Sequence, residues 1–194
     1  WSDPIQFKVA NPDTIDYVNS LRITEINYHP KGASQSEKDK GWTTSDFEYI
    51  EIQNISDKDL DLANLRLTKG VDFDFEAGTI LKSNQYILVV RNRIAFESRF
   101  GTGLPITGEW DEGNKLDNAG ENIKLSYGAG TSIIEFSYDD KEPWPVGADG
   151  DGFTLNLKDP KTISQENHGV VSNWYPAVTS PGSEGKNAAV TFES

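Results

Sequence analysis

Apolar and polar residues alternate in several short segments of the chain. Within residues 46–54 (DFEYIEIQN), Ile50 and Ile52 would point to one side of an extended chain. Tyr49 and Glu51 would then point to the other side. Similar segments, rich in β-branched or aromatic residues and bounded by Gly, Asn, Asp or Pro, lie at 21–29, 85–92, 122–127, 132–138 and 153–159. The pattern predicts a protein built from six or more short strands.

Strands of this length with turns between them are typical of a sandwich or barrel, and we expect an all-β protein with an immunoglobulin-like β-sandwich. One segment has helical spacing instead: residues 93–101 (RIAFESRFG) place Ile94, Phe96 and Phe100 roughly on one side, with Gly101 as a stop. We therefore expect one short helix near 93–100. The apolar positions of the strands predict the core, which includes Ile23, Ile50, Ile52, Leu67, Leu88, Val90, Leu125, Phe136 and Leu155.

The two ends of the chain differ from its middle. Residues 1–20 begin with a strand-like segment, 1–9 (WSDPIQFKV), and continue as a Pro-, Asn- and Asp-rich stretch that is typical of a linker. This segment could be the last strand of a preceding fibronectin-like module or a strand added to the sheet of the main domain, which we place at 21–194. The polar stretch 31–46 and the tail after Pro160 are interpreted as additions to the sandwich.

The charge of the chain restricts its partners. The 194 residues contain 31 Asp and Glu against 18 Lys and Arg, a formal net charge of −13. Nucleic-acid binding needs clustered Lys and Arg, so we predict that the protein does not bind DNA at physiological salt. Anionic lipid surfaces are disfavoured for the same reason, and no apolar run approaches the length of a membrane helix, so we expect no membrane insertion.

The sequence contains no Cys, which excludes thiolate metal sites, thiol catalysis and disulfides. It also contains no Met, even at its first position, and we expect the chain to be a processed or excised piece of a longer protein. Excess acid and the lack of easily oxidised residues suit an extracellular or cell-surface setting. We expect the isolated piece to be a monomer.

Acidic residues near the strands are the first candidates for chemistry. Glu48 and Glu51 are three residues apart and would face opposite sides of a strand, so they do not form a paired-carboxylate site between themselves. Glu25 and Glu51 could approach across neighbouring strands. We interpret them as solvated or hydrogen-bonded structural residues on the wet face of a sheet. No catalytic set of acid, base and nucleophile emerges, and we do not expect an enzyme.

A metal site has one weak candidate. Asp149 and Asp151 in the segment ADGDG (148–152) offer oxygens to a hard cation such as calcium, although a Gly-rich hairpin turn explains the same pattern. His29 and His168 lie in polar surroundings without a second ligand at metal spacing, and we expect them at the surface. No other cofactor is predicted.

Aromatic residues beside acids could instead hold a sugar. Trp42 lies in the polar stretch 31–46, and Trp110 stands next to Asp111. These two are the candidate ligand platforms.

The order of segments resembles the lamin tail domain family in its bacterial type. The resemblance rests on LRITEINYHP (21–30), FEYIEIQNISDKDLDLANLRLTKG (47–70) and FEAGTILKSNQYILVVRN (75–92). In the second half it rests on KLDNAGENIKLSYGAGTSIIEFSY (115–138), WPVGADGDGFTLNLKDP (144–160) and NWYPAVTSPGSEGKN (173–187). It covers about residues 21–187 and departs from the family in the long stretch 31–46.

This resemblance implies an immunoglobulin-like fold and a place in an exported, often surface-associated, bacterial protein. We therefore expect a non-catalytic structural, adhesion or interaction module of a multidomain protein, with a protein or a surface glycan as partner. The alternative is a carbohydrate-binding module attached to an enzyme. In either case the contacts are expected in loops, namely the stretch 31–46 and the acidic loop around 109–122.

Overall fold

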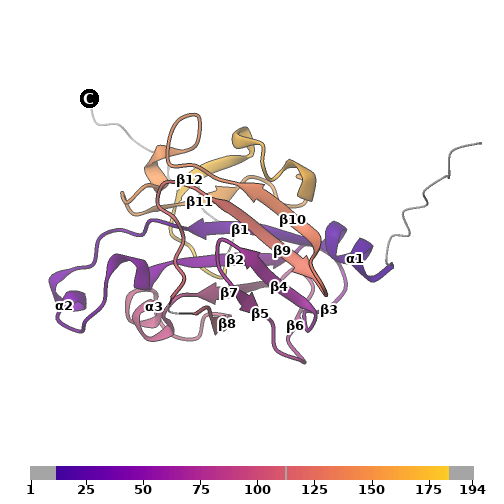
Figure 1. Ribbon diagram of the computed structural model, residues 1–194, viewed down its shortest axis with the longest axis horizontal. Coiled ribbons are helices and arrows are strands. Elements are labelled where there is room, and N and C mark those ends of the chain that lie inside the picture. The colour runs from indigo at the N-terminus through magenta and orange to yellow at the C-terminus, as the bar shows by residue number, and fades with distance from the viewer. Residues whose placement is uncertain (1–11, 112, 184–194) are drawn as a thin grey trace, which may run out of the picture.

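The computed structural model describes residues 12–111 and 113–183, which form two packed β-sheets with short helices at their ends (Figure 1). The larger sheet has six strands in the order β12 (Trp174–Val178), β11 (Phe153–Leu157), β1 (Leu21–Asn27), β2 (Tyr49–Asn54), β7 (Tyr86–Val90) and β8 (Ile106–Glu109). The smaller sheet has four strands in the order β10 (Thr131–Ser137), β9 (Asn122–Tyr127), β4 (Leu65–Lys69) and β5 (Phe73–Asp74). A two-stranded piece pairs β3 (Leu60–Asp61) with β6 (Ile80–Leu81). The predicted immunoglobulin-like β-sandwich is confirmed.

The core between the two sheets contains the apolar side of the alternating pattern. Ile50 and Ile52 of β2 are fully buried there, together with Ile23 of β1 and with Leu67 and Leu125 of the smaller sheet. All nine predicted core residues are buried. Burial of this apolar surface is the main force that joins the sheets. Two of the nine, however, lie in a second cluster on the opposite face of the larger sheet: Leu88 and Val90.

The helices lie at the ends of the sandwich. The predicted helix is present as α3 (Arg93–Phe100), and Asn92 caps its first turn. Two α-helices and four short 3₁₀ segments were not predicted: α1 (Pro12–Ser20), α2 (Gln35–Lys38), η1 (Thr44–Phe47), η2 (Val146–Ala148), η3 (Gln165–Asn167) and η4 (Val171–Asn173). None of the helices in the described part of the chain has both the length and the apolarity to cross a bilayer.

The linker expected before the main domain is instead helical from Pro12 onward, so this interpretation was wrong for 12–20. Proline suits the first position of a helix, because the amide hydrogen that it lacks has no partner there. Tyr17 and Val18 then pack against the main core, and the Tyr17 hydroxyl donates to the Asp61 carbonyl at 2.6 Å. The strand expected at 1–9 lies outside the described residues.

The tail after Pro160 is part of the larger sheet rather than an addition to the sandwich. Its strand β12 pairs antiparallel with β11 over five residue pairs, from Phe153 opposite Val178 to Leu157 opposite Trp174. Trp174 is buried, and its indole nitrogen donates to the His168 carbonyl at 2.6 Å. Pro176 is tolerated because β12 forms the edge of the sheet and needs only one neighbour.

Candidate functional site: an acidic pocket at the start of helix α3

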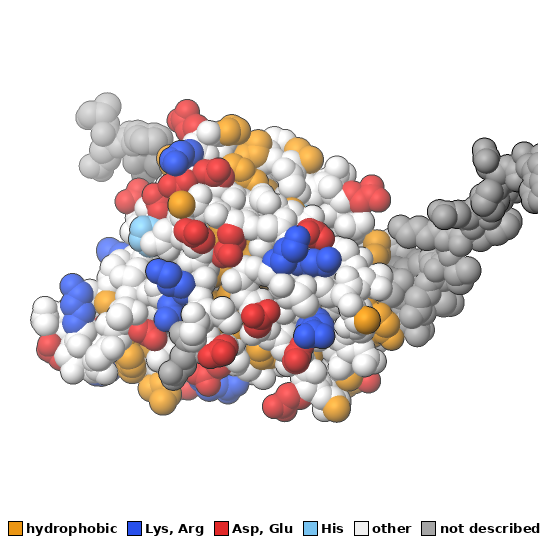
Figure 2. All heavy atoms as spheres, viewed as in Figure 1, with side chains coloured by type: hydrophobic (Ala, Val, Ile, Leu, Met, Phe, Trp, Pro, Cys, Tyr) orange, Lys and Arg blue, Asp and Glu red, His pale blue; other side chains and the backbone are white. Residues whose placement is uncertain are grey.

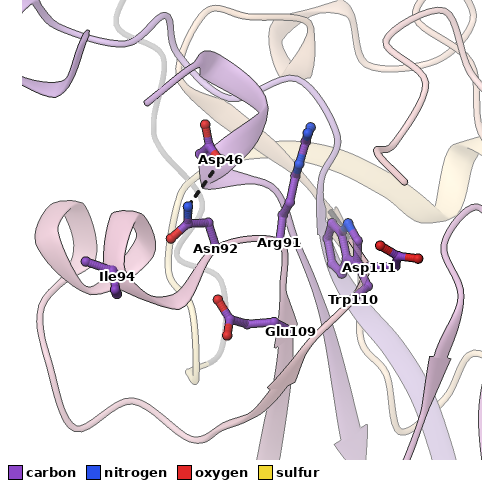
Figure 3. Close-up of a pocket in the computed structure, with 7 residues that line it drawn as sticks. All are labelled: Asp46, Arg91, Asn92, Ile94, Glu109, Trp110 and Asp111. Carbon is purple, nitrogen blue, oxygen red and sulfur yellow. Dashed lines mark hydrogen bonds between the residues drawn. The ribbon is translucent and has the colours of Figure 1, made fainter. Parts of the chain in front are cut away.

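A pocket of about 640 Å³ opens beside the first turn of α3 (Figure 3). It is lined by residues from four places in the fold: Asp46 of η1, Arg91 and Asn92 before α3, Ile94 of α3, and Glu109, Trp110 and Asp111 at the end of β8. The stretch 31–46 and the loop 109–122, which the sequence marks as the contact regions, thus meet in one cavity. The sequence did not predict that they meet.

Hydrogen bonds to the N-terminus of α3 hold the pocket together. The Asn92 side chain accepts from the Ala95 amide at 3.0 Å and donates to Asp46 at 3.2 Å. Glu109 accepts from the Arg93 amide at 2.6 Å. Backbone amides at a helix start have no partner within the helix, and the helix dipole favours acids there. The acids of the pocket are therefore fixed by the fold of this corner.

The pocket is mainly acidic. Asp46 is partly buried, whereas Glu109 and Asp111 are exposed, and Arg91 is the one base in the lining. Burial alone would raise the pKa of Asp46, but hydrogen bonds from the amide and hydroxyl of Thr43 and from Asn92 outweigh it. They hold the pKa of Asp46 below its ordinary value, so this wall of the pocket stays negatively charged at neutral pH.

Arg91 is unusual because its side chain is largely buried and has no hydrogen-bond partner in the described part of the chain. Its side chain is 18% exposed, and its nearest acid is Glu48, with 4.0 Å between Arg91 Nη1 and Glu48 Oε1. Both of these atoms are buried and have no hydrogen-bond partner among the described residues. The second oxygen of Glu48, the residue between η1 and β2, accepts from the Leu116 amide at 2.8 Å and so ties the acidic loop to this corner. Burial raises the pKa of Glu48 to about 7.

The two candidate aromatic platforms have different positions. Trp110 is 3% exposed, belongs to the main core and donates from its indole nitrogen to the Asn114 carbonyl at 3.2 Å. It offers no open ring face, so its assignment as a platform was wrong. Trp42 is partly buried, meets Phe47 edge-on, and has the Lys40 ammonium 4.6 Å from its ring centroid. A sugar-binding role for Trp42 stays a prediction.

The candidate calcium ligands lie away from this pocket. Asp149 is paired with His29 at 2.5 Å between carboxylate oxygen and ring nitrogen, and the two residues also form an isolated β-bridge. Asp151 is exposed in the following turn. Within the described residues no three His, Cys, Asp or Glu side chains converge on one point, so a cation here would depend largely on backbone oxygens and water. Calcium binding stays a prediction.

The face of the larger sheet that the sequence predicted to be exposed to solvent is buried. Glu25 and Glu51 stand opposite each other on β1 and β2, as expected, but they are 0% and 1% exposed. A bulge at Thr24 in β1 turns both Thr24 and Glu25 toward the face that carries Glu51. This side of the sheet is covered by α3 and by the turn after β12. The assignment to solvent was wrong because a second layer of chain covers the polar face.

Both buried carboxylates are hydrogen-bonded. Glu25 Oε1 accepts from the Tyr49 hydroxyl at 2.6 Å, from the Thr154 hydroxyl at 2.5 Å and from the Ser180 amide at 3.2 Å. Glu51 accepts from the Thr24 hydroxyl at 2.6 Å and from the Gly182 amide at 2.7 Å. The hydrogen-bonded structural role that the sequence suggested for this pair is confirmed.

Burial perturbs the acidity of the pair. It raises the pKa of Glu25, and the pKa of Glu51 rises to about 8, first through burial and then through the charge of Glu25. A cavity of about 40 Å³ touches Glu51, which leaves room for a water molecule but not for a substrate. Perturbed acids mark many active sites, but here the geometry gives them no reactant.

His168 is buried as well, so its assignment to the surface was wrong, whereas His29 is partly exposed. Burial lowers the pKa of His168 to about 4, which keeps the ring neutral. The ring packs between Phe136 and Trp174, at centroid distances of 5.4 and 6.2 Å. Its role is therefore to fill the core beneath β12.

Two comparisons with known proteins bear on the identity of the chain. A search of curated proteins finds no match. A family model for the lamin tail domain matches residues 17–140, which include the end of α1, the smaller sheet and four strands of the larger one. Strands β11 and β12 lie beyond the match and complete the larger sheet. The match covers well over half of the chain and agrees with the sandwich and its strand order. The chain therefore belongs to the lamin tail domain family.

Proposed function

We propose that this domain is a non-catalytic interaction module of an exported bacterial multidomain protein, located outside the cell or on its surface. The observation that carries the proposal is the acidic pocket. It joins the two segments in which the sequence places recognition, and loops held on a rigid sheet are common positions for binding residues. Lamin tail domains are immunoglobulin-like structural and interaction domains, which agrees with this role.

The positions of the perturbed acids support a non-catalytic role. Glu25, Glu48 and Glu51 are at most 1% exposed, and each accepts hydrogen bonds from the surrounding chain. A general acid or base has to reach its substrate directly or through one water molecule. These carboxylates hold strands and loops together instead. The alternative of a carbohydrate-binding module loses Trp110 as a platform and rests on Trp42.

A screen of the purified domain tests the proposal. We expect binding to proteins or intact cells without turnover of hydrolase substrates, and no retention on a glycan array. Turnover that survives repurification and disappears in Glu48→Gln or Glu51→Gln would contradict the non-catalytic role. Strong, specific retention of one glycan that Trp42→Ala abolishes would favour the carbohydrate-binding alternative.

The same screen should include duplex DNA. Figure 2 shows one face of the molecule, on which the Lys and Arg side chains of the described residues are scattered among Asp and Glu without a continuous basic stripe. With a net charge of −13, we expect no mobility shift at physiological salt. A shift at micromolar protein would overturn this expectation.

A further inference from the structure

Arg91 and Glu48 leave hydrogen-bonding capacity unused at the wall of the pocket. A guanidinium has five N–H donors, and burial without partners is costly. Arg91 is 18% exposed and forms a long ion pair with Glu48, at 4.0 Å, but among the described residues its side chain has no hydrogen-bond partner; the Glu48 side chain is 1% exposed, and its Oε1 lacks a donor there too. Figure 3 shows Arg91 extending between Asn92 and Trp110. Nη1 is buried against Glu48, and the exposed part of the Arg91 side chain lines the pocket, so an acceptor on a bound molecule would approach the guanidinium from the pocket side.

The rest of the lining requires a different property of that molecule. Asp46, Glu109 and Asp111 against Arg91 give the pocket three acids and one base, a formal charge of −2. A purely anionic ligand would satisfy Arg91 but would be repelled by the three acids. Inorganic phosphate and nucleotides therefore fit poorly. The ligand must carry a positive charge beside an uncharged acceptor.

An apolar side chain at the rim adds a third requirement. Ile94 is 72% exposed on the first turn of α3, directly in the pocket lining, although it is a large aliphatic residue. Exposed aliphatic residues next to a polar cavity are typical of surfaces that contact another protein. The pocket thus combines positions for a cation, for an uncharged acceptor and for an apolar group.

A polypeptide meets all three requirements at once. We propose that the pocket binds a Lys- or Arg-bearing segment of a partner protein, with the basic side chain among Asp46, Glu109 and Asp111. A main-chain carbonyl of the segment accepts from Arg91, and a neighbouring aliphatic side chain covers Ile94. A neutral sugar would gain nothing from the net charge of the pocket. This inference rests on the proposed interaction role and specifies the class of partner.

The test compares two doubly substituted domains of equal charge. Glu109→Gln with Asp111→Asn removes two pocket charges and keeps the acceptor oxygens that receive the Arg93 and Gly113 amides. The control, Glu76→Gln with Asp57→Asn, makes the same chemical changes at exposed acids outside the pocket. The probe is an end-capped peptide of Ala, Leu and two Lys residues, titrated to about 1 mM, with binding followed by NMR shifts of the Trp110 indole N–H.

We expect the wild-type domain to bind this peptide, the pocket variant to bind it about fivefold to tenfold more weakly, and the control to stay within about twofold of wild type. Arg91→Gln should weaken binding although it makes the pocket more negative, which general charge attraction does not explain. Equal weakening in both double variants, tighter binding by Arg91→Gln, or no binding at all would overturn the inference. If cells or proteins are still bound when the peptide is not, the interaction role stands and only the partner class fails.

Discussion

The centres of the two faces of the six-stranded sheet are equally buried but differ in composition. One face presents Ile23, Ile50 and Ile52 to the smaller sheet, with no polar atom to satisfy. The other presents Glu25 and Glu51, which are as deeply buried as the isoleucines. Apolar burial needs only a partner surface, whereas each carboxylate needs donors at defined distances. The position of a residue on a strand and its exposure to solvent are therefore separate properties.

The cover of the polar face comes from distant parts of the chain. Phe96 and Phe100 of α3 pack over Tyr49 and Val90. The turn after β12 supplies the Gly182 amide, which donates a hydrogen bond to Glu51. Gly182 lies 131 residues after Glu51 in the chain. A side chain at this position would collide with Pro105, since an added Cβ lies 2.9 Å from its ring, and φ is +79°. Glycine is therefore needed for the turn to come this close.

Removing the helical cover should have the largest effect on stability. Phe96 is fully buried against Tyr49 and Phe100, with ring centroids at 5.4 and 4.7 Å. We expect Phe96→Ala to lower the free energy of unfolding by about 3–5 kcal/mol in urea denaturation. On the same helix Ile94→Ala should change it by less than about 0.5 kcal/mol, because Ile94 is exposed. Equal effects of the two substitutions would mean that α3 does not seal this face.

The apolar face should respond nearly as strongly. Ile52 is fully buried between the sheets, and Ile52→Ala leaves a cavity that costs about 2–4 kcal/mol of unfolding free energy. The same denaturation measurement applies. A loss below about 0.5 kcal/mol would show that Ile52 is not part of the core.

Removal of one donor from the carboxylate network should cost less. Tyr49→Phe keeps the ring and deletes one of the three hydrogen bonds to Glu25, so we expect a loss of about 1–2 kcal/mol in the same assay. Tyr127→Phe is the control, since its hydroxyl has no hydrogen bond in the described part of the chain, and it should stay near wild type. Identical stabilities of the two variants would show that the Tyr49 hydroxyl does not support Glu25.

The smallest effect is expected from the charge of Glu51. Its pKa of about 8 lies above the ordinary value of 4.5, so the folded protein holds a proton that the unfolded chain releases between these values. The stability linked to Glu51 is thus full below about pH 4.5 and is lost as the pH rises through about 8. Glu51→Gln keeps the shape of the side chain without the charge. As the pH rises from 6.5 to 8, its free energy of unfolding should therefore increase by about 1 kcal/mol relative to that of wild type.

The pH window above 6.5 isolates this effect from His168. The pKa of His168 is lowered from 6.5 to about 4, so its linked stability changes in the opposite direction and only below about pH 6.5. Glu48 titrates near pH 7 in both proteins, and its contribution cancels in the difference. If the difference in unfolding free energy between Glu51→Gln and wild type did not change with pH, Glu51 would not carry the proton assigned to it.

Much of the architecture could be predicted from local pattern. The alternation of Ile50 and Ile52 with Tyr49 and Glu51 fixed two opposite sides of β2, and both sets lie on the sides expected. The spacing around Phe96 predicted α3. The ordered series of strand motifs indicated the lamin tail family, which the family model confirms. These features depend on residues a few positions apart, so the sequence alone determined them.

The sequence did not determine what covers each surface. Glu25 and Glu51 became buried because the turn at 180–182 contacts them on a face that α3 also covers, and His168 became buried beneath β12. The acidic pocket exists because residues 46, 91 and 109–111 meet in space. Alternation indicates which way a side chain points, but contacts between segments that are far apart in the chain decide whether water or protein lies there. Tertiary packing, and not local pattern, therefore separated the structural acids from those that are open to a partner.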